Sequence, residues 1–358
     1  MGKIRVAITG VGNCASSLVQ GVHFYRDRTE GFVPGLMHVD FGGYFIRDIE
    51  FVAAFDINRL KIGKDLSEAI FAEPNKVDHI SKVPTTGVEV MAGPILDGVA
   101  PHMRDSFRVY DENKTKPVNV AKVLEQTNAD MLVNYIPVGS LEGTRYYAEA
   151  ALDAGCAFVN CIPEFIASDE HWAKRFEERR LPVAGDDIKS QLGATILHRV
   201  LTELFLDRGV VIENTYQLNI GGDTDFENMT VEDRLRTKRI SKTEAVKSLL
   251  PYDVPMRIGP SDYVPFLGDK KICYIKIAGR GFEERPIILD AKLQVEDSPN
   301  SGGVVIDVIR AAKIALDRGI AGALTSISSY AFKHPPLQVV DEKAKILVEE
   351  FIEGKKER

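Results

Sequence analysis

The chain has 358 residues, of which 44% are hydrophobic and 27% charged, and its formal net charge is −7. This length suits two domains with a sizeable core, and the composition is ordinary for a globular protein. The acidic balance argues against nucleic acid as a partner. No apolar run approaches the roughly 18 residues that a membrane-spanning helix needs, so we expect no membrane partner either.

The first segments predict a dinucleotide site. Residues 6–9 are a short β-prone run, and residues 13–22 follow as a helix with one apolar face. A Gly-x-Gly turn between such elements lets the backbone approach a pyrophosphate, which the helix N-terminus binds through free N–H groups and its dipole. We therefore expect NAD at this turn, which consists of Gly10, Val11, Gly12, Asn13, Cys14 and Ala15.

A second strand, at residues 51–56, ends on Asp56. A carboxylate at this place accepts hydrogen bonds from the adenosine ribose hydroxyls and repels a 2′-phosphate, which favours NAD over NADP. Asp56 comes 46 positions after Gly10, whereas the usual spacing is roughly 20 residues. We interpret residues 24–48, which are rich in glycine and aromatic residues, as an ordered insertion that accounts for the difference.

The β/α alternation continues through the first 200 residues. Strands are expected at residues 130–135, 157–160 and 182–185, and a helix at residues 141–154. Pro137 follows the first of these strands, and we place it in the cofactor site. This order predicts an α/β fold with a Rossmann-type, doubly wound parallel sheet.

The pattern changes at about residue 213. Residues 214–220, 272–277 and 287–295 alternate as half-exposed strands do, which predicts an inserted α+β domain with an antiparallel sheet. Residues 304–316 form an amphipathic helix that returns to the first domain. We therefore divide the chain into a NAD-binding domain (1–200), an inserted domain (201–300) and a C-terminal return (301–358).

Two polar clusters follow the cofactor turn. Residues 185–191, Gly-Asp-Asp-Ile-Lys-Ser-Gln, end a strand and open a helix at the ligand edge of a parallel sheet. Helix capping explains one aspartate but not the pair with a lysine. Lys238 and Lys242 are four positions apart and share a face if their segment is helical. Two solvated lysines are the alternative on spacing alone.

Several separated motifs in one order resemble the myo-inositol-1-phosphate synthase family, in its shorter bacterial form, over nearly the whole chain. They are Gly-Val-Gly-Asn-Cys-Ala-Ser-Ser at 10–17, Pro-Gly-Leu-Met-His at 34–38, the 185–191 segment, Ser-Lys at 241–242 and Glu-Asp-Ser-Pro-Asn-Ser at 296–301. The longer eukaryotic enzymes open with a different Gly-rich turn, and they continue with Gly-Gln-Thr after the Lys-Ser of the 185–191 motif. Here Gln191 follows Ser190, so from Gln191 onward the residues that contact the phosphate are assigned only to within one or two positions.

The resemblance implies conversion of D-glucose 6-phosphate to 1D-myo-inositol 3-phosphate, also named L-myo-inositol 1-phosphate, in inositol and phospholipid biosynthesis. NAD+ oxidises C5 of the open-chain sugar. Loss of a C6 proton gives an enolate that attacks the C1 aldehyde, and NADH then returns the hydride. Because the net redox change is zero, the enzyme is an isomerase of the intramolecular lyase type. The resemblance also implies a homotetramer built through the inserted domain.

The same resemblance implies a set of site residues. An enolate and an aldolate each need a nearby cation in a site shielded from water. The lysines that would line the substrate site are Lys238, as oxyanion stabiliser and proton shuttle, Lys242 and Lys276, as phosphate ligands, and Lys333, which would touch the sugar. The remaining residues are Asp187, Asp225 and Asp297, which would orient hydroxyls and lysines, Asp186, at the nicotinamide, and Ser190 and Gln191, near the phosphate.

The scattered cysteines and histidines predict no histidine-rich metal site. Four cysteines form no CxxC pair and seven histidines form no HxH or HExxH, which favours reduced thiols in a cytoplasmic enzyme. A divalent cation is associated with some members of the family. An ion held by phosphate, cofactor and one carboxylate would leave little trace in a sequence, so this alternative stays open.

Two other functions compete with the synthase. An NAD-dependent dehydrogenase of a phosphorylated sugar or aldehyde would use the same fold and cofactor turn. Cys156 and Cys161, however, lie in an apolar strand, where core packing is the default, so neither is placed like the nucleophile of a phosphorylating aldehyde dehydrogenase. A non-catalytic Rossmann NAD sensor is the second alternative, and it would not need the set of lysines and aspartates.

Overall fold

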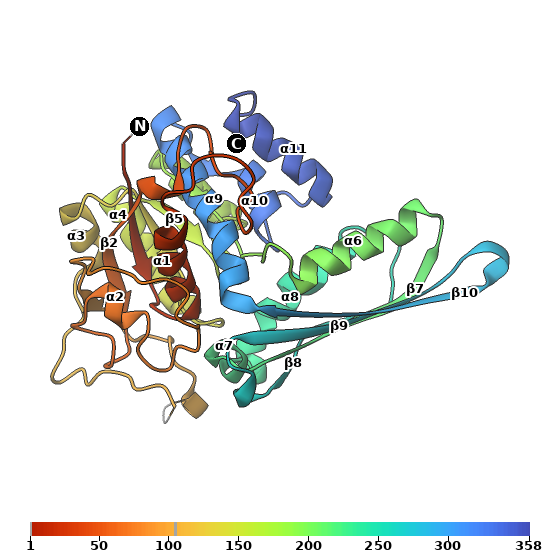
Figure 1. The fold of residues 1–358 in the computed structure, drawn as a ribbon, viewed down its shortest axis with the longest axis horizontal. Helices are drawn as coiled ribbons and strands as arrows, with labels where there is room; N and C mark the ends of the chain where they lie inside the picture. Colours follow the sequence, from red (N-terminus) through yellow and green to blue (C-terminus); the bar gives the residue numbers. More distant parts are fainter. Residues whose placement is uncertain (1, 104–105) are drawn as a thin grey trace.

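The computed structural model describes residues 2–103 and 106–358. Within them a parallel sheet has the strand order β11-β6-β5-β4-β1-β2-β3 (Figure 1). The strands are β1 (Ile4–Thr9), β2 (Ile49–Asp56), β3 (Val90–Ala92), β4 (Met131–Asn134), β5 (Ala157–Asn160), β6 (Pro182–Ala184) and β11 (Gly322–Ala323). The order changes direction between β1 and β4, where such sheets bind ligands. The predicted Rossmann-type sheet is confirmed.

Helices cover both faces of this sheet and bury two separate apolar cores. One face carries α1 (Asn13–Tyr25), α2 (Leu66–Ala69), α9 (Asp297–Arg318), α10 (Thr325–Ala331) and α11 (Asp341–Ile352). The other carries α3 (Val120–Gln126), α4 (Leu141–Ala154) and α5 (Glu170–Glu178). Short 3-10 turns lie at Ile46–Asp48, Pro101–Met103, Pro265–Leu267 and Phe282–Glu284. No helix of the described residues has the length and apolar character that crossing a membrane requires.

The stretch between α1 and β2 is an ordered insertion, as its composition predicts. Its anchor is Arg310 on α9, whose side chain is 0% exposed. The guanidinium donates to the backbone oxygens of His38, Val39 and Tyr44 at 2.8, 3.1 and 3.2 Å and forms an ion pair with Asp307. One buried cation therefore satisfies the carbonyls of a segment that has little secondary structure of its own.

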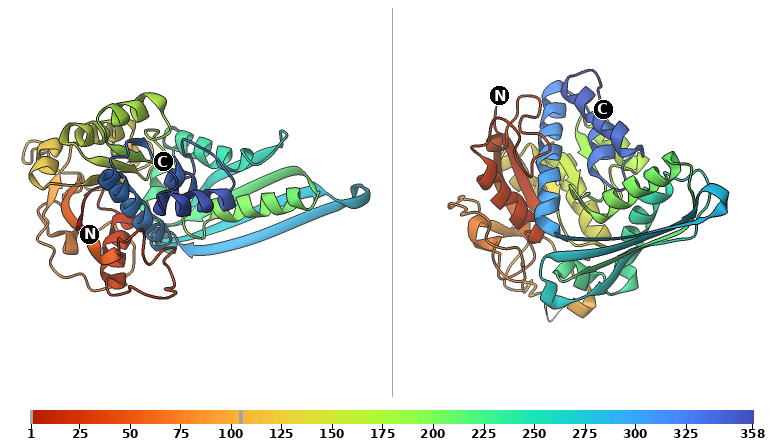
Figure 2. Two further views of the ribbon diagram at one scale, coloured as in Figure 1. Left: turned by 90° about the horizontal axis from the view of Figure 1, so that it is seen from above. Right: turned by 45° about the vertical axis from the view of Figure 1, so that its right-hand side comes forward.

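A second sheet projects away from the first as a long extension (Figures 1 and 2), with strand order β10-β9-β7-β8. Its strands are β7 (Val211–Gly221), β8 (Met256–Tyr263), β9 (Lys270–Arg280) and β10 (Pro286–Glu296). The sheet is mixed: β9 is antiparallel to β7 and β10, but β8 is parallel to β7. The expectation of an antiparallel sheet was therefore wrong for β8. A parallel pair needs a crossover connection, which α7 (Thr224–Asn228) and α8 (Glu232–Lys247) supply.

The two faces of this second sheet differ in burial. Cys273, Ile275 and Ile277 of β9 point to the inner face, where α6 (Ala194–Asp207) packs on them. Tyr216 and Tyr274 point to the outer face and are 37% and 40% exposed. Because side chains alternate along a strand, parity alone assigns every residue of β9 to one face or the other.

Helix α9 joins the two parts. It begins at Asp297, directly after β10 ends at Glu296, and continues for 22 residues along α1 into the first core. The periodicity at residues 304–316 predicts only the later turns of this helix. Pro299 in the first turn is compatible with it, because the N–H that proline lacks would have no partner within the helix.

Gly10 and Gly12 differ in backbone conformation and in the space around them, so alanine should destabilise the fold at Gly10 and not at Gly12. Gly10 has φ +84, and a Cβ there would lie 2.6 Å from the carbonyl carbon of Tyr135. Gly12 has φ −90 and open space around it. We expect Gly10→Ala to lower the free energy of unfolding by about 1–3 kcal/mol and Gly12→Ala to change it by less than about 0.5 kcal/mol. Equal midpoints of urea denaturation for the two variants would contradict this.

Candidate active site

One cavity lies where the carboxyl ends of the parallel strands face the second sheet. Its wall includes residues after β1, β2, β4 and β5, the N-termini of α1, α6, α7 and α9, and the start of β9. The sequence-predicted residues that line it are Gly10, Gly12, Asn13, Cys14, Asp56, Pro137, Ser190, Asp225, Lys238, Lys242, Asp297 and Lys333. Gly10 and Lys333, which are 333 − 10 = 323 positions apart in the sequence, thus line one cavity.

The glycine turn lies at one end of this cavity. The N–H of Gly10 donates to the backbone oxygen of Phe55 at 2.9 Å, which ties the turn to β2. Asp56 ends β2, as predicted, and accepts the N–H of Val11 at 2.7 Å. Helix α1 starts at Asn13 with no acidic residue in its first turn. Its N–H groups therefore keep their positive character where they face the cavity.

Asp187 organises the opposite end. Its carboxylate is 0% exposed and accepts from Lys238 at 3.1 Å, Lys333 at 2.8 Å and the hydroxyl of Ser241 at 2.6 Å. Burial alone would raise the pKa of Asp187, but the two ammonium groups outweigh it and hold that pKa well below the usual range. Asp187 is not part of the cavity wall; it lies behind Lys238 and Lys333, which are. The carboxylate therefore fixes both cations at the surface of the site.

The lysines of the cavity are in different electrostatic situations. Burial would lower the pKa of Lys238, but Asp187 and Asp225 raise it above the ordinary value, so Lys238 stays an ammonium. Burial lowers the pKa of Lys242 to about 7, and repulsion by Lys238, Lys271 and Lys333 adds to this. Burial also lowers the pKa of Lys333, to about 8, against the attraction of Asp187. Lys242 is therefore the cation with the least compensation, and an anion would restore its charge.

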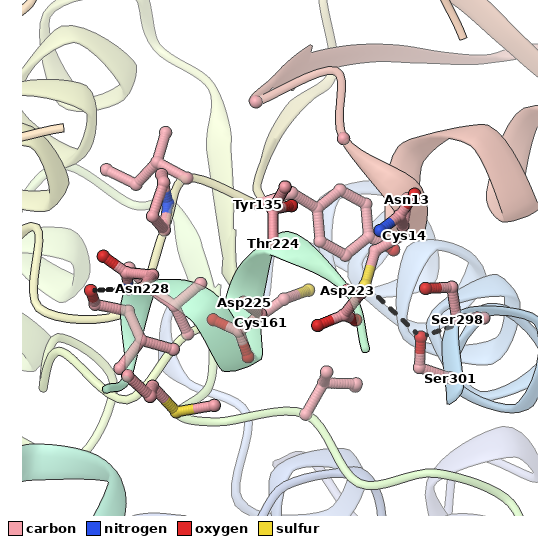
Figure 3. Close-up of a pocket in the computed structure, with 18 of the residues that line it drawn as sticks. Asn13, Cys14, Tyr135, Cys161, Asp223, Thr224, Asp225, Asn228, Ser298 and Ser301 are labelled. Carbon is pink, nitrogen blue, oxygen red and sulfur yellow. Dashed lines mark hydrogen bonds between the residues drawn. The ribbon is translucent and has the colours of Figure 1, made fainter. Parts of the chain in front are cut away.

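Carboxylates gather beside the first turns of α7 and α9. Figure 3 shows Asp223, which caps α7, and Asp225 within α7 facing the same space as Cys14 on α1 and Ser298 and Ser301 on α9. Burial raises the pKa of Asp225, and it raises that of Asp223 well above the ordinary value with help from Asp225 and Asp297. This end of the cavity can therefore hold protonated carboxyl groups, which donate as well as accept hydrogen bonds.

Asp297 connects the acidic and basic groups. It opens α9, forms an ion pair with Lys271 and lies 3.5 Å from the hydroxyl of Ser190. Burial would raise the pKa of Asp297, but Lys271 lowers it below the ordinary value. Asp269 accepts from the backbone N–H of Ser298 at 3.1 Å and from its hydroxyl at 2.6 Å, and burial raises the pKa of Asp269 to about 7.

Lys276 does not line the cavity, in contrast to the expectation from resemblance. It lies on β9 opposite Tyr216 and Asp290, on the outer face of the second sheet. Lys271, on the same strand, has the parity of Cys273 and Ile275 and therefore points to the inner face. Its ammonium lines the cavity beside Asp297.

Three further predicted residues lie outside the cavity wall. Asp186 is 0% exposed, and its carboxylate accepts from Asn160 at 2.7 Å and from the hydroxyl of Ser168 at 2.7 Å, so it fixes the loop after β5 rather than facing a ligand. Gln191 donates to the backbone oxygen of Gly35 at 2.9 Å, which holds the 34–38 turn. Ala15 is fully buried within α1.

The sequence-based predictions missed Lys271, Asp223 and Asp269. Alternation along residues 272–277 shows that the strand has two faces but not which one meets the site, so it could not choose between Lys271 and Lys276. Asp223 is the N-cap of α7, where its carboxylate accepts the backbone N–H of Phe226 at 3.0 Å. The part of the chain that the structure describes contains no group of three or more His, Cys, Asp or Glu side chains placed to hold a metal ion.

Comparison with known proteins identifies the family. The family model described as myo-inositol-1-phosphate synthase matches residues 193–298. The chain is 54% identical to inositol-3-phosphate synthase of Mycolicibacterium smegmatis, with 99% of each chain covered. It is 52% identical to the enzyme of the same name from Corynebacterium glutamicum, with 98% of each covered.

A solved structure agrees over the whole length. The crystal structure of Ari2 has a TM-score of 0.79 and 33% identity, and the match covers 98% of this chain and 99% of that one. The matches therefore span the dinucleotide turn, the lysine-rich cavity and the second sheet together, and not only the common Rossmann part. The chain belongs to the family of inositol-3-phosphate synthases, also named myo-inositol-1-phosphate synthases.

Proposed function

We propose that this protein converts D-glucose 6-phosphate to 1D-myo-inositol 3-phosphate. The observation that carries the proposal is the single cavity in which a dinucleotide-type turn adjoins the lysines 238, 242, 271 and 333. A plain dehydrogenase needs the turn and one acid–base group, and a sensor needs the turn alone. A reaction through an enolate and an aldolate needs several cations around one sugar phosphate.

NAD fits the turn end of the cavity. Gly12 leaves open space where a side chain would stand, α1 directs its N-terminus there, and Asp56 lies at the end of β2. Bound NAD would supply a hydride acceptor for C5 and would return the hydride after ring closure. Gly10, Gly12, Asn13 and Cys14 would hold the pyrophosphate, Asp56 the adenosine ribose, and Pro137 the wall beyond it.

The substrate phosphate belongs at the N-terminus of α6. Ser190, Gly193 and Thr195 line the cavity there, and Lys242 and Lys271 lie in the same wall. Two ammonium groups and a helix N-terminus together match a phosphate dianion. We therefore assign the phosphate to Lys242 and Lys271, and Lys271 replaces the Lys276 that resemblance alone suggested.

Lys238 and Lys333 would act on the reacting carbons. Both are anchored on Asp187, and Lys333 also donates to the backbone oxygen of Ile188. Two N–H groups of Lys238 and one of Lys333 are left for substrate oxygens. The high pKa of Lys238 suits it to stabilise the enolate and aldolate oxygens, whereas the lowered pKa of Lys333 suits it to accept a proton. Asp225 and Asp297 would orient sugar hydroxyls.

The oligomer and its setting complete the proposal. The outer face of the second sheet exposes Tyr216, Tyr274 and Ile288, the last by 60%. A sheet face with large exposed apolar side chains is suited to subunit contact, and we propose a homotetramer assembled through it. We also propose a cytoplasmic enzyme. A divalent cation would be an additional ligand of phosphate and cofactor, and turnover in a chelator tests for it.

The first prediction concerns the reaction and Lys238. With glucose 6-phosphate and catalytic NAD, we expect the protein to form inositol 3-phosphate without net formation of NADH. Chromatography of the product measures this. Lys238→Ala should lower this turnover by about 10²–10³-fold or more because it removes the cation nearest the developing oxyanion. NADH binding, followed by its fluorescence, should persist. Full turnover in the variant would remove Lys238 from this role, and stoichiometric NADH would favour the dehydrogenase.

The second prediction separates Lys271 from Lys276. Lys271→Ala should raise the KM for glucose 6-phosphate about 10- to 100-fold, since a charged hydrogen bond to phosphate is lost. Lys276 lies on the outer face proposed for subunit contact, so Lys276→Ala should change KM by less than about threefold wherever sedimentation shows the parent's oligomer. Steady-state kinetics and sedimentation of both variants check this, and a larger KM effect at Lys276 would reverse the assignment.

The third prediction concerns proton uptake. At pH 8 Lys242, with its pKa near 7, is mostly neutral in the free protein, and a bound phosphate dianion should raise that pKa. Binding of glucose 6-phosphate should then take up about one proton at pH 8 and fewer at pH 6, where Lys242 is already charged. Calorimetry in two buffers of different ionisation enthalpy measures the uptake.

The control for this experiment is the exposed Lys247 on the same helix. Lys242→Met should lose most of the uptake at pH 8, and Lys247→Met should keep it. An unchanged uptake in Lys242→Met would show that another group takes the proton.

A further inference from the structure

Lys61 is a buried cation at the cofactor end of the cavity that no assigned role uses. It follows β2 by five positions and is 1% exposed, yet it belongs to the cavity wall beside Asp56. Its ammonium donates to the backbone oxygen of Val11 at 2.6 Å and to the Oδ1 of Asn75 at 2.8 Å. A lysine is rarely buried to this extent unless its charge is needed where it lies.

Lys61 and Asp56 hold the two ends of the same residue in the glycine turn. Asp56 accepts the Val11 N–H at 2.7 Å, while Lys61 donates to the Val11 carbonyl. The second oxygen of Asp56 accepts the backbone N–H of Asn58 at 2.7 Å. The position of the turn is therefore set by the side chains of Asp56 and Lys61, and both lie in the wall of the site.

The ammonium has hydrogen-bonding capacity left. It carries three N–H groups, and within residues 2–103 and 106–358 two of them have protein acceptors and no carboxylate forms an ion pair with it. Asp56 also keeps lone pairs beyond its two backbone bonds. A hydroxyl group both donates and accepts. The pair therefore matches a hydroxyl that donates to Asp56 and accepts from Lys61.

We propose that Lys61 and Asp56 together bind the adenosine ribose. One ribose hydroxyl donates to Asp56 and accepts from Lys61, and Lys61 also holds the Val11 carbonyl of the turn. This inference rests on the proposed use of NAD. It also makes cofactor choice a property of the pair. Asp56 repels a 2′-phosphate and Lys61 attracts one, so the carboxylate suppresses a latent NADP site.

Binding of NADH and NADPH to the full chain, measured by dinucleotide fluorescence, tests the contact. Lys61→Met should weaken NADH binding about tenfold or more, and Lys61→Gln, which keeps a donor for Val11, covers the case in which the methionine variant does not fold. Lys64→Met is the matched control, because Lys64 is exposed on the same loop, and it should bind NADH within about twofold of the parent. NADH affinity unchanged in both Lys61 variants would overturn the proposal.

Asp56→Ser supplies the readout that a purely structural lysine would not move. With the carboxylate gone, the preference for NADPH over NADH should rise about tenfold or more, and the double variants Asp56→Ser/Lys61→Met and Asp56→Ser/Lys61→Gln should lose that gain. A lysine that only supports the turn would weaken both dinucleotides equally, so an unchanged preference in the double variants would refute the ribose contact. A parent chain that binds neither dinucleotide would instead overturn the cofactor proposal itself.

Discussion

The buried carboxylate of Asp187 is the interaction on which the rest of the site depends. It joins three segments that are distant in sequence: the loop after β6, helix α8 through Lys238 and Ser241, and the chain after α10 through Lys333. The side chain is 0% exposed, so an unpaired charge there would be destabilising. Removing one partner of such a buried ion pair typically costs about 3–5 kcal/mol of stability. The same contacts of Asp187 therefore hold the two parts of the fold together and fix the positions of Lys238 and Lys333.

The lysines in turn explain why the acids stand where they do. Lys238, Lys242, Lys271 and Lys333 share one wall, and repulsion by the other three adds to burial in lowering the pKa of Lys242. Asp187 and Asp297 offset part of this charge through ion pairs with Lys238 and Lys271. Helix α9 holds Asp297 in place, because Asp297 lies in its first turn and its later turns are buried against α1.

Local signals predicted much of this structure, and the failures have a common origin. Strand and helix periodicity located β5 and α4 to the residue and β1 and α1 to within three residues at one end. The spacing of two lysines on α8 was enough to put them on one face. Three expectations differ from the structure: Lys276 in the substrate site, Asp186 at the nicotinamide, and an antiparallel direction for every strand of the second sheet. Each depends on which face of an element meets a partner from elsewhere in the chain, and a pattern within one element does not contain that information.

Asp56 shows the same difference between sequence pattern and spatial contact, because its position in space is the expected one although its spacing in the sequence is not. The usual spacing of roughly 20 residues between glycine turn and acid is the length of a simple helix crossover, not a requirement of the chemistry. In this chain the crossover carries an insertion that Arg310 anchors to α9, and β2 still returns beside β1 in parallel register. Asp56 consequently ends β2 within 2.7 Å of the Val11 N–H, although 46 positions separate it from Gly10. The geometry of the motif depends on the strand order and on the hydrogen bond from the turn to Asp56. An insertion that changes neither of them leaves the geometry of the turn unchanged.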